Sequence, residues 1–237
     1  MKKTVFALIL MFSLLLALTA CGGDKTPATE NPGNSDSPVT TDEPGSEAPS
    51  DTADPNAAIT EEMVRSHAVA PAADFVYDIT DNGVKIGGYN GSDTIVVIPE
   101  EIEGKPVTEF YDFVFANDSP VRAVLIPESV KTLGQVFINS EKIELVICEG
   151  VTKLAGLTFG NCSNLRNVVL GEDLQEIVGL GAFADCPKLE EVHFTNNLTQ
   201  IESEYTFDGC ENLTIYAPTG SYAETFANEN NIPFKAE

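Results

Sequence analysis

The sequence predicts a β-rich solenoid, a right-handed coil of short repeats whose parallel strands form one sheet along its concave side. A β-hairpin should cap the N-terminal end of the coil and a short helix its C-terminal end. Three observations predict this architecture. A phenylalanine returns at nearly constant spacing, apolar columns keep fixed distances from it, and turn and helix-capping signals stand at the two ends.

The repeat is defined by a phenylalanine that recurs in steps of 22, 22, 24 and 24 residues, at Phe115, Phe137, Phe159, Phe183 and Phe207. Six residues after each phenylalanine comes another apolar side chain: Val121, Ile143, Leu165, Leu189 and Leu213. An alternating apolar pair follows three and five residues later: Val124 and Ile126, Val146 and Cys148, Val168 and Leu170, Val192 and Phe194. Alternation indicates strands with one buried face. One such unit cannot bury that face alone, so successive units should stack.

The N-terminus has the features of a bacterial export signal. Lys2 and Lys3 precede residues 4–20, which carry no charge, and Leu18-Thr19-Ala20-Cys21 resembles the lipobox. We therefore expect residues 1–20 to be a lipoprotein signal peptide and Cys21 to be the lipid-modified first residue of the mature chain. The alternative is an uncleaved membrane helix near the lower length limit. Both interpretations place the rest of the chain outside the membrane.

Residues 21–73 are expected to be a disordered spacer between the lipid and the folded part. They are rich in Pro, Thr, Ser, Asp and Glu and contain no aromatic residue, so they cannot bury enough apolar surface to offset the entropy of ordering. A coil of this length reaches on the order of 40 Å. Residues 59–69 should form at most a brief helix.

The charge balance restricts the possible partners. The formal net charge is −24, and carboxylates outnumber basic side chains in residues 74–237 as well. This balance disfavours a nucleic-acid partner, because phosphate binding needs a basic face. An anionic membrane surface would also repel the chain, which leaves a covalent lipid as the route of attachment.

The repeat pattern, L-x-x-V-x-(L/F)-x-x-x-(L/V)-x-x-I followed by A/T-F-x-x-C, resembles the BspA-like (Treponema pallidum type) leucine-rich repeat. The resemblance covers residues 74–237 and implies a leucine-rich-repeat solenoid of about five to six repeats with caps. Residues 75–110 resemble the N-terminal entry of the family, and Asn82-Gly83 favours a hairpin turn. Ala217-Pro218 should end the last strand, and Ser221 to Glu224 forms a capping box for a helix to about Asn230. Asp118, Ser140 and Cys148 depart from the family pattern.

The cysteines Cys162, Cys186 and Cys210 share one column of the repeat, and we expect them to pack in the core. Equivalent positions in stacked turns lie about 4.8 Å apart, which is too far for three thiolates in a ladder to share one zinc ion. Nucleophilic catalysis needs a nearby base, but His67 lies in the spacer and His193 on the opposite side of its strand. A disulfide between neighbouring turns is the alternative that the spacing permits.

The strand residues that alternate with the core define the candidate site. One outward row contains Val97, Leu125, Ile147, Val169 and His193, and the next contains Ile95, Ala123, Leu145, Asn167 and Glu191. The first copies present aliphatic side chains, which is typical of a docking surface. The candidate partner-binding residues are Val97, Leu125, Leu145, Ile147, Val169 and His193, with Arg122 and Arg166 beside them. The alternatives are β-branched residues kept for strand propensity alone and a slipped register.

The sequence contains no phosphate-binding loop, paired metal-ligand motif or matched acid and base. We therefore expect no enzymatic activity, no cofactor and no metal. Members of the family that it resembles are mostly surface or secreted proteins associated with adhesion to host, matrix or other cells. This resemblance implies a lipid-anchored protein on the extracellular face of a bacterial membrane that binds an unidentified protein. A solute- or glycan-binding lipoprotein of the cell envelope is the alternative.

Overall fold

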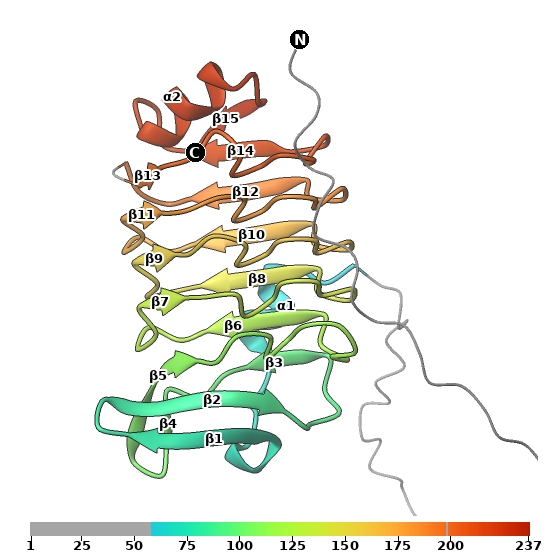
Figure 1. Ribbon diagram of the computed structural model, residues 1–237, viewed down its shortest axis with the longest axis vertical. Coiled ribbons are helices and arrows are strands. Elements are labelled where there is room, and N and C mark those ends of the chain that lie inside the picture. Colours follow the sequence, from blue (N-terminus) through green and yellow to red (C-terminus); the bar gives the residue numbers. More distant parts are fainter. Residues whose placement is uncertain (1–57, 198) are drawn as a thin grey trace, which may run out of the picture. The chain divides into compact units, whose positions relative to one another are not determined.

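The computed structural model describes residues 58–197 and 199–237. The expected signal peptide, Cys21 and the expected spacer up to residue 57 lie outside the described residues. Within the described part, the chain forms a coil of stacked turns (Figure 1). None of the described helices has the length and apolar character needed to cross a membrane.

Seven parallel strands form the long sheet on one side of the coil. They follow each other in sequence order, with β15 at one edge and β3 at the other. They are β3 (Ile95–Val97), β6 (Ala123–Ile126), β8 (Leu145–Cys148), β10 (Asn167–Leu170), β12 (Glu191–Phe194), β14 (Thr214–Ala217) and β15 (Phe234–Ala236). A second parallel sheet stacks β7 (Thr132–Leu133), β9 (Lys153–Leu154), β11 (Glu176–Ile177) and β13 (Gln200–Ile201). The predicted solenoid of stacked parallel strands is confirmed.

The core lies inside the coil and contains the predicted columns. In the long sheet, Val124, Val146, Val168 and Val192 are in register and have no exposed surface. The five recurring phenylalanines form one stack, with ring centroids 5.3, 5.2, 4.9 and 4.9 Å apart and rings tilted by only 14–19°. Stacking of identical turns gives each ring two neighbours of its own kind, which one repeat alone could not supply.

The chain turns after each phenylalanine, and the second residue after the phenylalanine has a left-handed backbone. The residues at this position are Asn117, Asn139, Asn161, Asp185 and Gly209, with φ between 46° and 77°. Asn, Asp and Gly tolerate this region better than other residues, which explains a column that the hydrophobic pattern leaves polar. Main-chain bonds between turns, such as Asn161 N to Ala184 O at 2.9 Å, hold the column in line.

At the N-terminal end, β1 (Phe75–Thr80) and β2 (Gly83–Tyr89) form the predicted antiparallel hairpin. They join β5 (Lys105–Phe110) and β4 (Glu101–Ile102) in a four-stranded sheet, preceded by the short 3-10 helix η1 (Ala72–Asp74). The two turn residues are Asp81 and Asn82, one position earlier than expected, because Gly83 already pairs with Thr80. Gly83 has φ +141°, and a Cβ there would lie 2.4 Å from the Pro106 carbonyl oxygen.

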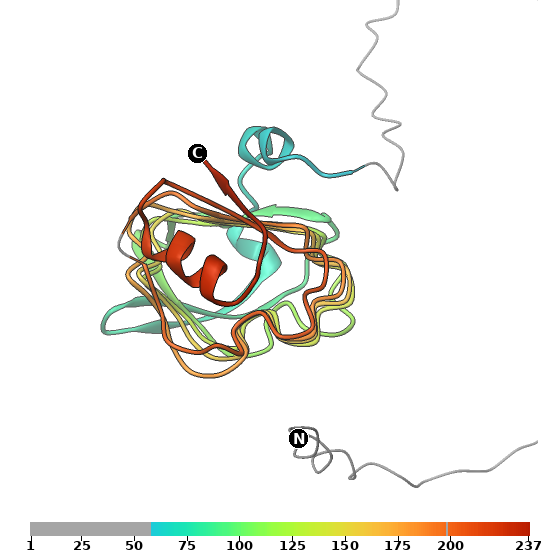
Figure 2. The ribbon, with the colours of Figure 1, turned by 90° about the horizontal axis from the view of Figure 1, so that it is seen from above.

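At the C-terminal end, α2 (Tyr222–Glu229) covers the open end of the coil (Figure 2). The predicted cap at Ser221 is confirmed, since its hydroxyl accepts a hydrogen bond from the Glu224 amide at 3.1 Å. Phe226 of α2 meets the last stacked phenylalanine, Phe207, edge to face at 6.0 Å. The chain then returns as β15, which sequence reasoning did not predict.

The folded part begins earlier than expected. Residues 58–73, assigned from composition to the spacer, contain the helix α1 (Glu61–Ser66), an isolated bridge between Val69 and Val97, and η1. The boundary expected at residue 73 is therefore wrong for this stretch. Composition misses it because few of its side chains are apolar and packed: Ile59 and Val64 on the outer face of the sheet, and Ala70 and Ala72 at the core.

Candidate functional site

The candidate site is the outer face of the long sheet, which points away from the core. Its predicted register is confirmed: Val97, Leu125, Ile147, Val169 and His193 are paired in one row across the strands. Ile95, Ala123, Leu145, Asn167 and Glu191 form the neighbouring row. The alternative of a slipped register is thus excluded.

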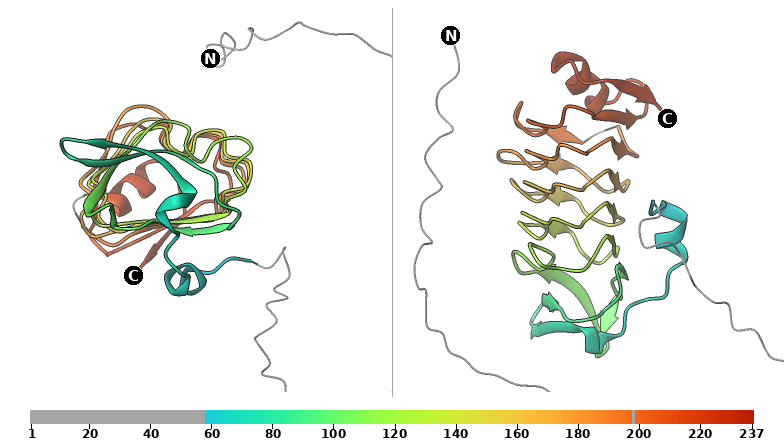
Figure 3. Two further views of the ribbon diagram at one scale, coloured as in Figure 1. Left: turned by 90° about the horizontal axis from the view of Figure 1, so that it is seen from below. Right: turned by 90° about the vertical axis from the view of Figure 1, so that its right-hand side faces the viewer.

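The apolar half of this face is covered by the chain itself. Figures 1 and 3 place α1 outside the coil, against the long sheet. Val64 of α1 is fully buried in a second hydrophobic cluster, separate from the core, that also contains Val97, Ala123, Leu125, Leu145 and Ile147. Leu145 and Ile147 retain 2% and 0% of their surface. The expectation of an open apolar strip is therefore wrong here, because residues 59–64 supply the apolar partner that the strip requires.

Polar contacts at both ends fix α1 in place. Thr60 caps the helix by accepting a bond from the Met63 amide at 3.3 Å. Arg65 pairs with Glu149 at 2.6 Å, at the end of β8, and with Glu61 at 2.7 Å. After the helix, the Ala70 amide donates to the Val97 carbonyl at 2.9 Å. A hollow of about 380 Å³ remains beside α1, between Arg65, Val169 and the acidic loops after β6, β8 and β10.

The C-terminal half of the face carries a connected polar cluster that α1 does not contact. His193 stacks on Tyr216 with centroids 4.5 Å apart, and its ring nitrogens lie 2.7 Å from Glu237 and 3.3 Å from Glu191. The Tyr216 hydroxyl donates to Glu191 at 3.1 Å and accepts from Lys235 at 2.9 Å. The contact with Tyr216 raises the pKa of Lys235. We call these five residues the His193 cluster.

Sequence reasoning found only part of the His193 cluster. It identified His193 and Glu191, but it missed Tyr216, Lys235 and Glu237. Tyr216 continues the outward row by one more strand, so extending the alternation to β14 would have found it. Lys235 joins through β15, whose three residues give too short a pattern for any periodic signal.

The two candidate arginines lie immediately before strands of the long sheet and are engaged in ion pairs along the stack. Arg122 pairs with Glu144 at 2.7 Å, with its side chain mostly buried, and Arg166 pairs with the more exposed Glu190. Each pair joins one turn to the next. Both arginines therefore contribute to stacking, and Arg166 is the more accessible of the two.

Cys148, Cys162 and Cys186 are buried in the core, as expected, whereas Cys210 at the end of the ladder is half-buried. Cys148, Cys162, Cys186 and Cys210 are free thiols, so the disulfide alternative is not formed. The last three each donate to the carbonyl of the preceding repeat's phenylalanine, at 3.1, 3.0 and 3.0 Å. Burial raises the pKa of Cys148 to about 12, which keeps it protonated and unreactive. No group of three or more metal-binding side chains occurs among residues 58–197 and 199–237.

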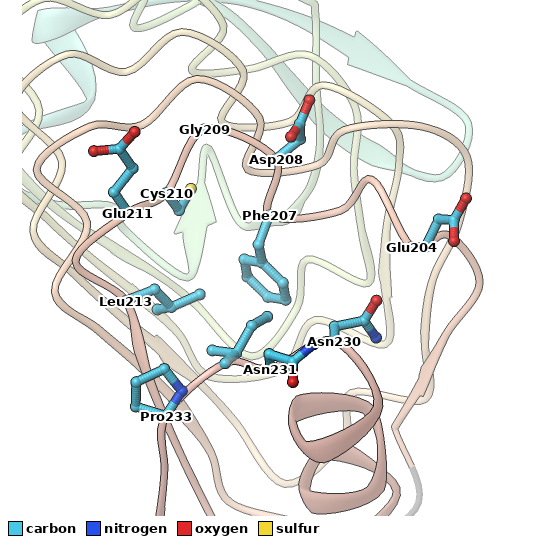
Figure 4. Close-up of a pocket in the computed structure, with 11 residues that line it drawn as sticks. Glu204, Phe207, Asp208, Gly209, Cys210, Glu211, Leu213, Asn230, Asn231 and Pro233 are labelled. Atoms are coloured by element: carbon cyan, nitrogen blue, oxygen red, sulfur yellow. The ribbon is translucent and has the colours of Figure 1, made fainter. Parts of the chain in front are cut away.

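A second hollow, of about 330 Å³, lies at the C-terminal end of the ladder (Figure 4). It is lined by the last phenylalanine turn, including Phe207 and Cys210, and by residues 230–233 before β15. The neighbouring Cys186 thiol and burial raise the pKa of Cys210. Its rim is acidic, with Glu204, Asp208 and Glu211.

The comparisons with known proteins agree with this repeat architecture. The family model described as the BspA type leucine rich repeat region matches residues 94–214 in six copies. No curated protein matches the chain.

Among solved structures, the leucine-rich repeat protein of T. pallidum is 28% identical with a TM-score of 0.57, over 63% of this chain and 71% of that chain. A leucine-rich cell surface protein from Faecalibacterium prausnitzii is 23% identical with a TM-score of 0.38, over 66% and 38% of the two chains. A leucine-rich repeat protein from Bacteroides ovatus is 17% identical with a TM-score of 0.34, over 64% and 47%. This chain therefore spans less than half the length of the latter two.

Proposed function

We propose, from the premise that this chain belongs to the BspA-type leucine-rich repeat family, that it is a non-enzymatic binding protein that recognises another protein. The observation that carries this proposal is the outer face of the long sheet. Seven parallel strands align their side chains there in regular rows, which gives a rigid surface of the kind that repeat proteins use for binding.

The accessible part of this face is the His193 cluster together with the adjoining Asn167 and Val169. The stacked rings of His193 and Tyr216 offer flat apolar surface, while Glu191 and Lys235 offer charged acceptors and donors. Aromatic side chains with polar groups at their edge are enriched in protein interfaces. The class of partner that we propose is a protein of a host surface, of the extracellular matrix or of another cell.

A lipid at Cys21 would present this surface on the extracellular face of a bacterial membrane. The support is the sequence Leu18-Thr19-Ala20-Cys21 after an uncharged apolar run. The full-length chain should partition with membranes and incorporate radiolabelled palmitate. A Cys21→Ser variant should do neither, and membrane retention of that variant would refute the lipid anchor.

Binding should be measured by surface plasmon resonance of the full-length chain over a panel of immobilised extracellular-matrix proteins. The variant His193→Ala with Tyr216→Ala should weaken binding by roughly tenfold or more. Val76→Ser on the distant β1, where the valine is exposed, is the control and should bind normally. If the double variant bound as tightly as the Val76→Ser control, the His193 cluster would not be the binding site. Calorimetric binding of free sugars or peptides without any protein ligand would favour the solute- or glycan-binding alternative.

A further inference from the structure

A third surface of the molecule carries large apolar side chains on the turns before the stacked phenylalanines, most of them exposed and two with a left-handed backbone. It consists of Phe113, Leu157, Leu180 and Tyr205, which we call the lateral row. These residues follow β5, β9, β11 and β13. The level of β7 lies between those of β5 and β9 in Figure 1, and its turn carries the polar Gln135 at the equivalent position. None of these four residues lies in the long sheet or lines the hollow in Figure 4. Glu204, the neighbour of Tyr205, does line that hollow.

The side chains of the lateral row are unusually exposed for their type. Phe113, Leu180 and Tyr205 retain 53%, 64% and 53% of their surface, and Leu157 is half-buried. No aromatic ring contact involves Phe113 or Tyr205 within the described residues. The molecule's own packing therefore does not account for large apolar side chains at these positions.

The backbone is left-handed at two of the four residues of the lateral row, Phe113 and Leu157. Two residues before the repeating phenylalanine, φ is +68° at Phe113, +62° at Leu157 and +63° at Gly181. At Gly181 the residue is a glycine, which adopts this region without strain. A bulky side chain there costs free energy, and such strain is concentrated at functional sites. Phe113 thus combines backbone strain with apolar exposure, whereas Leu180 and Tyr205 are exposed without a positive φ.

The turns stack level by level, so the lateral row runs along one side of the coil, with Gln135 between Phe113 and Leu157. The Phe113 amide donates to the Gln135 carbonyl at 2.9 Å, which links the first two turns. The Leu157 side chain lies against Gly181 in the turn that carries Leu180. The Phe183 amide donates to the Thr206 carbonyl at 2.9 Å, which links that turn to Tyr205.

The charges around the lateral row define its partner. The five turns, residues 111–118, 133–140, 155–162, 179–186 and 203–210, contain no lysine or arginine. Their charged residues are Asp112, Asp118, Asp185, Glu204 and Asp208. A second copy of this acidic chain would be repelled at such a surface, whereas a basic partner would be attracted.

We propose that the lateral row is a docking surface for a protein segment that places apolar side chains between lysines or arginines. The apolar groups fill the row, and the basic groups meet the carboxylates around it. This surface is separate from the outer face of the long sheet, so the proposal holds whatever binds there.

The test uses the full-length chain and two synthetic amphipathic peptides of equal length, one of leucine and lysine and one of leucine and glutamate. The leucine–lysine peptide should bind, and Leu180→Ser with Tyr205→Ser should weaken its binding by roughly tenfold or more. Val76→Ser with Ile79→Ser is the matched control, because these β1 side chains are 52% and 47% exposed and lie near Asp78 and Asp81. The control should bind like the unmodified chain.

A second variant separates binding from folding. Phe113→Gly should leave the Tm unchanged or higher, because glycine relieves the positive φ, and it should still weaken binding of the leucine–lysine peptide. Unchanged binding by the row variants, or equal binding of both peptides, would overturn the proposal. Sedimentation that shows self-association, lost on Leu180→Ser with Tyr205→Ser, would replace the basic partner by a second copy and overturn it too.

Discussion

Replacing Val64 by aspartate should release α1 from the long sheet and leave the solenoid folded. Val64 is the one fully buried side chain of α1 and belongs to the outer cluster, in which α1 packs on β3 and β6. The phenylalanine stack and the core columns involve no residue of α1. The change therefore removes the apolar contact that holds the helix without opening the core.

The size of the effect follows from burial. Burying a valine side chain contributes about 2 kcal/mol, and a six-residue helix has little stability of its own. The exposed Arg65–Glu149 pair adds no more than about 1 kcal/mol. Losing the valine contact should therefore shift the balance between docked and undocked α1 by about 30-fold. The buried site would also disfavour the aspartate charge, which increases the shift.

Native-state hydrogen exchange provides the assay. The amides of Val64 and His67, which donate within α1, should exchange about 30-fold faster or more in Val64→Asp. The amides of β8 and β10 should keep their protection, and binding of a hydrophobic dye should rise as the strip opens. Met63→Asp is the matched control, since Met63 is exposed on the same helix. Unfolding of the whole solenoid by Val64→Asp, or unchanged exchange in α1, would refute a separately docked helix.

Four further predictions concern the core and its turns. Phe159→Ala removes the middle ring of the stack, which is fully buried, and should lower the free energy of unfolding in urea by about 3–5 kcal/mol; a smaller loss would mean that neighbouring rings fill the gap. Asn161 has φ +59°, so Asn161→Ala should lower the free energy of unfolding by about 1 kcal/mol. Asn161→Gly should change it by no more than about 0.5 kcal/mol. Equal losses for the two variants would contradict the conformational explanation. Among Cys148, Cys162, Cys186 and Cys210, iodoacetamide at alkaline pH should modify Cys210 first, because it alone is partly exposed. The raised pKa of its thiol should keep the reaction slow, and mass spectrometry of the native protein can check the order. Burial raises the pKa of Cys148 from 9.0 to about 12, so its contribution to stability should be complete below pH 9 and be lost as the pH rises toward 12; a Cys148→Ala variant should lack this part of the alkaline transition.

The sequence predicted the repeats because their signal is periodic. Equivalent residues of successive turns contact one another, so each column keeps the same kind of side chain. The turns from Phe115 to Phe207 could therefore be aligned from the sequence alone. The alternation in β6 to β12 then determined which side chains point outward, and the structure agrees residue by residue. The capping box at Ser221 was equally local, since it depends on residues within one turn of helix.

The candidate site was only half predictable. Val97, Leu125, Leu145 and Ile147 were correctly placed on one face, but their exposure depended on a segment far away in sequence. Residues 59–66 have no repeat and little apolar surface, so nothing local indicated that Val64 would cover that face. β15 was missed for the same reason, and with it the part of the His193 cluster that contains Lys235 and Glu237.

The sequence by itself determined the stacked repeat, the inward and outward faces of its strands, and the core position of the cysteines. Each of these follows from contacts between equivalent residues of adjacent turns, which a period makes visible. Tertiary structure alone decided that α1 covers the apolar half of the outer face and that Tyr216 and Lys235 complete the polar half. These contacts join segments that share no period, so they are set by which surfaces meet when the chain is folded.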